Sequence, residues 1–286
     1  MAKTKNLGKV FQSPFRYPGG KGFLSEYLEN ELLKIDVDIP DYAEPYAGGA
    51  GAAIKLLSAG KVRRIRINDA DQRIFSAWSA ILNNNERFIH SIDEVRVDIE
   101  NWNKYAEIVK NPALAQDSFQ LGFATFFLNR TNRSGIILKA GPIGGHKQAG
   151  DWKLDARFNK DNLIKRIKWI GQKSDQITLS NLDGLAYLKR AGKAAYSRKT
   201  LFFVDPPYVK AGGRLYLNLM TERKHQQLGE YLEGGHIPHW VVTYDHCPLI
   251  EDIYAKSHQS DLTVVYSLQK KRNQRELLIK SPSLVA

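Results

Sequence analysis

The chain has 286 residues, of which 43% are hydrophobic, enough for the core of one large domain or of one domain with an insertion. Its 42 lysine and arginine residues against 30 aspartate and glutamate residues give a formal net charge of +12, which favours a polyanionic partner. One cysteine, Cys247, excludes an internal disulfide, and the apolar stretches are too short for a signal peptide or a membrane span. We therefore expect a cytoplasmic protein with no membrane partner.

The first 85 residues alternate between strand and helix patterns. A turn rich in proline and glycine at 15–22 precedes an amphipathic stretch. A second glycine-rich segment, at 44–51, follows the first strand pattern directly. We expect helices at 23–33, 52–59 and 74–81, and strands at 41–43 and 62–67.

The pattern changes at about residue 86 and returns at about residue 171. Between these points strand signals are few, so we expect an insertion that is mostly helical or irregular. After it, we expect a helix at 225–231 and strands at 177–179, 201–204, 240–243, 262–266 and 276–279. Strands separated by helices predict an α/β fold with a largely parallel sheet, formed by 1–85 and 171–286 and interrupted by 86–170. The last two strands could instead form an antiparallel hairpin.

The segment at 44–51 has the features of a nucleotide-binding turn. Gly48, Gly49 and Gly51 lie between a strand and a helix, where glycine lets the backbone approach a ligand closely. Asp69 ends the next strand, and its carboxylate can accept hydrogen bonds from ribose hydroxyls. The spacing is not that of dinucleotide-binding proteins, and a turn that only eases the packing of a helix on the sheet would look similar.

The apolar strand at 201–204 ends in Asp205-Pro206-Pro207-Tyr208. Two consecutive prolines fix the backbone and remove two N–H donors, so a carboxylate and free carbonyls stand on a stiff loop at the edge of the sheet. Such acceptors can bind the N–H groups of an amino substituent on a base. A simple turn at the end of a strand is the alternative. Cys247 precedes a proline rather than following one, which argues against cytosine C5 chemistry, and we predict no metal site.

Three motifs and their order resemble the Dam-like (D12 class) family of DNA adenine-N6 methyltransferases. They are Tyr17-Pro18-Gly19-Gly20-Lys21, Glu44-Pro45-Tyr46-Ala47-Gly48-Gly49-Ala50-Gly51, and Asp205-Pro206-Pro207-Tyr208 after an insertion. The resemblance implies a Rossmann-like sheet that binds S-adenosylmethionine and an inserted target-recognition region. It also implies direct methyl transfer to a flipped-out adenine of double-stranded DNA, and the aspartate at position 205 favours adenine within this family.

The resemblance also implies roles for individual residues. Tyr17 would pack against the cofactor, and Lys21 would contact its amino-acid end. Asp69 would hold the ribose and Asp183 would meet the adenine moiety. Asp205 and the Pro206 carbonyl would bind the target amino group, with Tyr208 stacked on the base. The full predicted cofactor site is Tyr17, Lys21, Glu44, Pro45, Tyr46, Gly48, Gly49, Gly51, Asp69 and Asp183, and the catalytic site is Asp205, Pro206, Pro207 and Tyr208.

Predicted DNA contacts lie in two segments. The stretch 126–135 resembles the family's aromatic-x-Leu-Asn-Arg segment, and Arg130 and Arg133 could bind phosphates or a guanine edge. The glycine-rich stretch at 141–148 is expected to be a mobile loop that orders on DNA. A basic connection between the last two strands is either a phosphate clamp or a solvated turn. The predicted DNA-binding residues are Arg130, Asn132, Arg133, Lys270, Lys271 and Arg272.

Three functions remain open from the sequence. The first is a DNA adenine-N6 methyltransferase, alone or beside a restriction or phage-defence system. The second keeps the same chemistry but acts on RNA. The third is a DNA-binding relative that has lost catalysis, against which the intact Asp205 to Tyr208 motif argues.

Overall fold

The computed structural model describes residues 10–16, 21–209, 220–267 and 271–285, with side chains described outside 263–274. Seven strands form one sheet in the order β3-β2-β1-β4-β5-β7-β6. All neighbouring pairs up to β4–β5 are parallel, whereas β7 is antiparallel to both β5 and β6. The last two strands therefore form the antiparallel hairpin. The strands are β1 (Asp41–Glu44), β2 (Ile65–Asn68), β3 (Ile177–Ser180), β4 (Thr200–Val204), β5 (Trp240–Asp245), β6 (His258–Ser267) and β7 (Lys271–Lys280).

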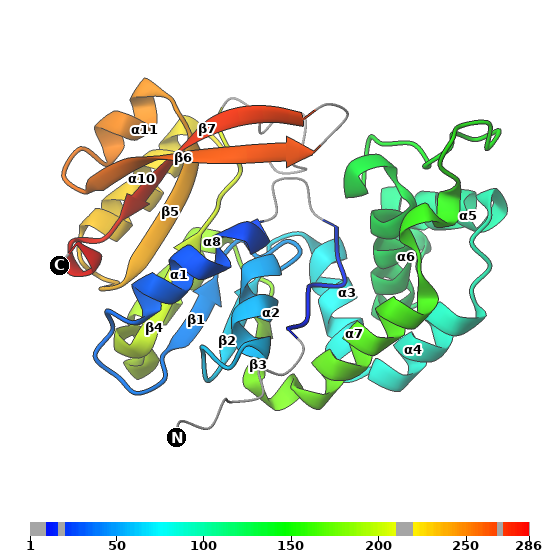
Figure 1. Ribbon diagram of the computed structural model, residues 1–286, viewed down its shortest axis with the longest axis horizontal. Helices are drawn as coiled ribbons and strands as arrows, with labels where there is room; N and C mark the ends of the chain where they lie inside the picture. Colours follow the sequence, from blue (N-terminus) through cyan, green and yellow to red (C-terminus); the bar gives the residue numbers. More distant parts are fainter. Residues whose placement is uncertain (1–9, 17–20, 210–219, 268–270, 286) are drawn as a thin grey trace, which may run out of the picture.

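Helices cover both faces of this sheet, as predicted for a parallel α/β fold (Figure 1). Side chains alternate along β4: Leu201 and Phe203 join one hydrophobic core, and Phe202 and Val204 join the other. The first core includes α1 (Ser25–Leu32), α2 (Gly51–Ser58) and α3 (Gln72–Asn83). The second includes α8 (Gly184–Gly192), α10 (Glu222–Glu233) and α11 (Pro248–Ile253). The continuous apolar run 201–204 is thus buried on both faces of the sheet.

The region between α3 and β3 forms a helical bundle beside the sheet (Figure 1). Its helices are α4 (Asn85–Glu94), α5 (Ile99–Lys110), α6 (Ser118–Thr131) and α7 (Lys160–Gln172). Three begin with a side chain that accepts a backbone N–H bond, namely Asp98, Asp117 and Asn159, which are preferred N-cap residues. The predicted helical insertion is confirmed. Its exact boundaries at 86 and 170 stay a prediction, because its core is continuous with that of α1 to α3.

The bundle meets the sheet domain where α6 crosses α3. Gly122 permits this crossing, because a Cβ added there would lie 2.3 Å from the Ser76 carbonyl oxygen. The two helices consequently approach backbone to backbone. None of the described helices is both long enough and apolar enough to cross a membrane.

The stretch at 141–148, which we expect to be a mobile loop, has several internal hydrogen bonds. Its backbone is tied to the end of α6, where Ile143 N donates to Thr131 O over 2.9 Å. The amide of Gln148 donates to the carbonyls of Ile143 and Gly145, and Lys153 Nζ donates to Gln148 O over 2.8 Å. Hydrogen bonds within the protein thus hold this loop in the conformation described, and the expectation that it is mobile and orders on DNA stays a prediction.

Candidate active site

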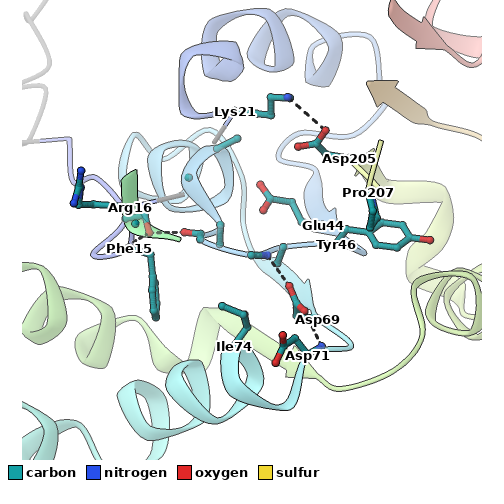
Figure 2. A pocket seen from close by; sticks show the side chains of 18 of the residues that line it. Phe15, Arg16, Lys21, Glu44, Tyr46, Asp69, Asp71, Ile74, Asp205 and Pro207 are labelled. Carbon is teal, nitrogen blue, oxygen red and sulfur yellow. Dashed lines mark hydrogen bonds and ion pairs between the residues drawn. The ribbon is translucent and has the colours of Figure 1, made fainter. Parts of the chain in front are cut away.

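A pocket of about 1020 Å³ opens at the carboxyl edge of the parallel strands (Figure 2). This is the edge at which α/β proteins bind ligands, because loops from several strands meet there. Its walls come from 12–16, from the glycine-rich turn, from the end of β2 at Asp69, and from the end of β4 at Asp205. The predicted cofactor and catalytic motifs thus share one cavity.

The glycine-rich turn is held from both sides. Gly48 and Ala50 both have φ of 47°, a left-handed conformation that favours glycine. Trp78 Nε1 donates to Gly48 O over 2.9 Å, and Gly48 N donates to the Asp69 carboxylate over 2.8 Å. Gly51 begins α2 beside Gly22, whose nitrogen is 3.4 Å from the position of an added Cβ. This packing presents bare backbone to the pocket.

Asp69 lies beneath this turn and is fixed before any ligand arrives. Its second carboxylate oxygen accepts a bond from Asp71 N over 2.9 Å. Burial raises the pKa of Asp69 to about 6, although both backbone N–H bonds act in the opposite direction. The carboxylate is preorganised at the pocket wall (Figure 2).

Glu44 lies in the pocket between the turn and Asp205 (Figure 2). Its Oε1 accepts bonds from Tyr42 OH and from Ala53 N, each 3.0 Å long. Burial raises the pKa of Glu44 to about 8, because the desolvation of the charged form outweighs these two hydrogen bonds. Pro45 contributes its carbonyl, which accepts a bond from Asn68 Nδ2 over 2.9 Å and joins the ends of β1 and β2.

Tyr46 and Asp183 meet where α8 docks against the pocket. A Cβ added to Gly184 would lie 2.2 Å from the Tyr46 ring, so a larger residue at the start of this helix would displace that ring. The Asp183 carboxylate caps α8 by accepting bonds from two backbone N–H groups. It also pairs with Lys224 over 3.3 Å, and both side chains are more than half exposed. Asp183 therefore lies at the rim of the pocket.

Asp205 is anchored by three side chains, namely Lys21, Tyr208 of its own motif, and Thr243 of β5. Its Oδ1 accepts a bond from Thr243 Oγ1 over 2.7 Å and one from Tyr208 OH over 3.1 Å. Lys21 Nζ lies 3.5 Å from the same oxygen. Lys21 in turn donates to Tyr208 OH over 2.6 Å and pairs with Glu276 over 3.1 Å. The result is a buried polar network centred on the predicted catalytic carboxylate.

Two members of this network were not identified from the sequence. Thr243 comes from β5 because Val204 pairs with Val242, which places the following residues, Asp205 and Thr243, side by side. Glu276 comes from β7, and both its side chain and that of Lys21 are at most 4% exposed. The sequence marks Thr243 and Glu276 only as polar residues beside an apolar run in their strands.

Other predicted residues occupy less expected places. Pro207 lines the pocket, but Pro206 and Tyr208 are buried behind it, so stacking on a base requires the Tyr208 ring to move. Lys21 lines the pocket while binding Asp205 and Glu276, rather than being available only for a cofactor. Tyr17 lies outside the described residues.

The predicted DNA contacts divide into three groups. Asn132 is fully buried and its amide bonds Trp102 and two backbone carbonyls, so we remove it from the predicted DNA surface. Arg133 packs on the 141–148 loop, where Nε donates to Pro142 O over 3.3 Å, and Arg130 lines the pocket. Lys270 lies outside the described residues, as do the side chains of Lys271 and Arg272, whose backbones begin β7.

A family model described as D12 class N6 adenine-specific DNA methyltransferase matches residues 17–274. The chain belongs to this family. One similar solved structure is the rRNA methyltransferase aviRa from Streptomyces viridochromogenes, with 12% sequence identity and a TM-score of 0.40 over 99% of this chain and 95% of that one. A search of curated proteins found no match. Among the residues that the structure describes, no cluster of histidine, cysteine and acidic side chains could hold a metal ion.

Proposed function

We propose that this D12-class chain transfers a methyl group from S-adenosylmethionine to the N6 amino group of an adenine in double-stranded DNA. The observation that carries the proposal is the anchored Asp205, which follows β4 and faces the same pocket as the glycine-rich turn. The family match supports adenine and DNA as the substrate class.

The residues of the pocket fit S-adenosylmethionine. Asp69 is held by two backbone N–H groups and can accept hydrogen bonds from ribose hydroxyls. When bound, the cofactor supplies an electrophilic methyl group. We propose that the predicted motif residues Tyr46, Gly48, Gly49, Gly51 and Asp183, all of which line the pocket, form its binding wall with Asp69.

Asp205 has the features needed to activate an amino group. The exocyclic nitrogen of adenine is a poor nucleophile, because its lone pair is delocalised into the ring. Acceptors for both of its N–H groups would localise that lone pair, and we assign these to the Asp205 carboxylate and the Pro206 carbonyl. The bonds from Thr243 and Tyr208 hold the carboxylate in one orientation before the base arrives.

The target adenine must leave the duplex to reach Asp205. Enzymes that modify an amino group inside a stacked duplex extrude the nucleotide into a pocket, at a cost of a few kcal/mol. Pro207 lines the cavity beside Asp205 and would contact the extruded base (Figure 2). Stacking by Tyr208 would follow once its ring leaves the buried network.

The test compares the wild-type chain with Asp205→Ala, using a labelled cofactor and either duplex DNA or structured RNA. We expect labelled adenine in duplex DNA from the wild type, no detectable transfer by the variant, and nearly equal cofactor affinity by calorimetry. The control is Asp175→Ala, which removes an exposed carboxylate just before β3, and it should keep full activity.

Each alternative function has its own result in this experiment. Labelling of RNA but not DNA would support the RNA enzyme, and cofactor binding without any labelling would support the silent relative. Methyl transfer by Asp205→Ala would contradict the catalytic assignment. Methylation-sensitive long-read sequencing of DNA from expressing cells would then report the recognition sequence. The fraction of recognition sites that are methylated in these cells would show whether they could tolerate a cognate restriction enzyme.

A further inference from the structure

Four arginines gather on one wall of the active-site pocket. We call Arg16, Arg130, Arg157 and Arg166 the arginine cluster, and all four line the cavity. They come from the segment before α1, the end of α6, a short 3₁₀ helix (Leu154–Arg157) and α7. Within the described part of the chain, no member of the cluster forms an ion pair with an acidic side chain.

The side-chain hydrogen bonds of the cluster go to neutral carbonyl groups. Arg130 Nε donates to Arg157 O over 2.7 Å, and Arg130 Nη1 donates to Pro14 O over 3.3 Å. Arg166 Nη1 donates to Ser13 O over 2.9 Å, and Arg16 Nη1 donates to Asn132 O over 3.3 Å. A guanidinium has five N–H donors, so Arg16 and Arg166 each retain donors for a ligand.

The charges of the cluster repel one another. The pKa of Arg130 is lowered to about 9. Burial is the main cause, and the nearby positive charges of Arg16, Arg166 and Arg157 lower it further. Burial and the charge of Arg157 also lower the pKa of Arg16. Four cations without a counter-charge are unfavourable in a partly buried site, and an anion placed among them would relieve that cost.

We propose that the arginine cluster binds a phosphodiester of the DNA strand next to the target nucleotide. Arg16 lies across the pocket from Asp205 (Figure 2), so a base bound at Asp205 would carry its own backbone towards this wall. The planar fork of arginine matches two phosphate oxygens, and binding a phosphate also releases counterions from DNA. This inference rests on the proposed function and gives Arg16, Arg157 and Arg166 a role that no sequence motif indicated.

The test measures DNA binding by the full chain without requiring methyl transfer. The probe is a fluorescent duplex with one adenine opposite an abasic site, which flips at little cost and needs no recognition sequence. The variant carries both Arg157→Gln and Arg166→Gln. The control carries Arg190→Gln and Arg198→Gln, which remove the same charge from exposed positions on the end of α8 and just before β4.

We expect the cluster variant to bind the probe about tenfold more weakly. The plot of log binding constant against log salt concentration should also be less steep, by about 0.9 for each phosphate that the variant no longer neutralises. The control should stay within about twofold of the wild type. A second probe carries neutral methylphosphonates on both sides of the unpaired adenine. This change should weaken binding by the wild type and leave the cluster variant nearly unaffected, because that variant no longer binds the phosphates that the probe lacks.

Three results would overturn the inference. Equal DNA binding by the wild type and the cluster variant would assign the cluster to stabilising the fold. Weaker binding of S-adenosylmethionine alone, with DNA binding unchanged, would assign it to the carboxylate of the cofactor. Stabilisation of the wild type by inorganic phosphate, with equal DNA binding, would assign it to a free anion. Arg157→Gln alone is the second variant if the double variant does not fold, since Arg157 is exposed.

These outcomes are separate from failure of the proposed function. A chain that never methylates adenine can still bind the probe through the cluster, and an active methyltransferase can bind DNA without it. The binding and transfer measurements therefore report on the two proposals independently.

Discussion

At the scale of single residues, Thr243 helps to orient Asp205. Its hydroxyl is fully buried and donates to the carboxylate over 2.7 Å. We expect Thr243→Val, which has nearly the same shape, to lower kcat about tenfold, equivalent to ~1.4 kcal/mol in the transition state. Affinity for S-adenosylmethionine should change little. Steady-state kinetics and calorimetry check this, and Thr243→Ser should restore most of the rate; equal kcat for all three proteins would contradict the assignment.

Glu44 should make stability depend on pH. Its pKa is raised to about 8 in the folded chain, above its ordinary value of 4.5, so the folded state binds the proton more tightly than the unfolded state. The fold is therefore destabilised as pH rises from about 4.5 to 8, and the effect levels off above that window. Glu44→Gln keeps an acceptor for Tyr42 and Ala53 but does not ionise.

We expect the Tm of Glu44→Gln to rise relative to that of the wild type as pH increases through this window. Thermal melts of both proteins at several pH values check the sign. Asp175→Gln, which removes one exposed carboxylate, is the control for the loss of a negative charge as such. A difference for Glu44→Gln that stays constant with pH would show that folding does not raise the pKa of Glu44, and one that shrinks with rising pH would show that folding lowers it.

At the scale of elements, the crossing of α6 and α3 depends on one missing side chain. Gly122→Ala would bring Cβ to 2.3 Å from the Ser76 carbonyl oxygen, and backbone cannot yield as a flexible side chain can. We expect a loss of about 1–3 kcal/mol in the free energy of unfolding, as for other overpacked cores. Urea denaturation measures it. Gly141→Ala, where nothing lies within 4 Å, is the control and should have a much smaller effect.

The elements also show how far sequence patterns reach. All seven expected strands are present, and so are the four helices expected outside the insertion, α1, α2, α3 and α10. Alternating or continuous apolar runs in the sequence mark these elements directly. The sequence pattern does not reveal the helix α6. All residues of 119–131 are buried except Gln120 and Arg130. A helix buried on nearly all sides has no apolar stripe, so its period of 3.6 residues is not visible in the sequence.

The sequence predicts those active-site residues that directly follow one recognisable strand. Asp205 and Asp69 each follow directly on a strand that is recognisable by itself, and both line the pocket. Thr243 and Glu276 required the pairing of strands: β7 returns between β5 and β6, and no local pattern reveals that order. The prediction that Asn132 binds DNA is wrong for a related reason. Its amide donates to buried backbone carbonyls, so it does not lie on the surface.

At the scale of the whole molecule, the helical bundle and the sheet should unfold together. One hydrophobic core runs from Leu28 and Ile54 beside the sheet, through Trp78, to Phe126 and Ile167 in the bundle. We therefore expect one calorimetric transition whose van't Hoff enthalpy equals the calorimetric enthalpy. A second measurement, near-ultraviolet circular dichroism, should melt at the same temperature. Two separated transitions would instead support the predicted division at 86 and 170 as independent domains.

The ion pair between Lys21 and Glu276 also sets an order in time. The two residues are separated by 255 positions, yet they meet beside Asp205. A ribosome adding roughly 5–20 residues per second makes Lys21 on the order of 13–50 s before Glu276. During that interval a nascent chain can bury much of its sheet but cannot complete the network around its reactive carboxylate. Complete methyl-transfer activity would thus be acquired only late in synthesis, when β7 enters the sheet.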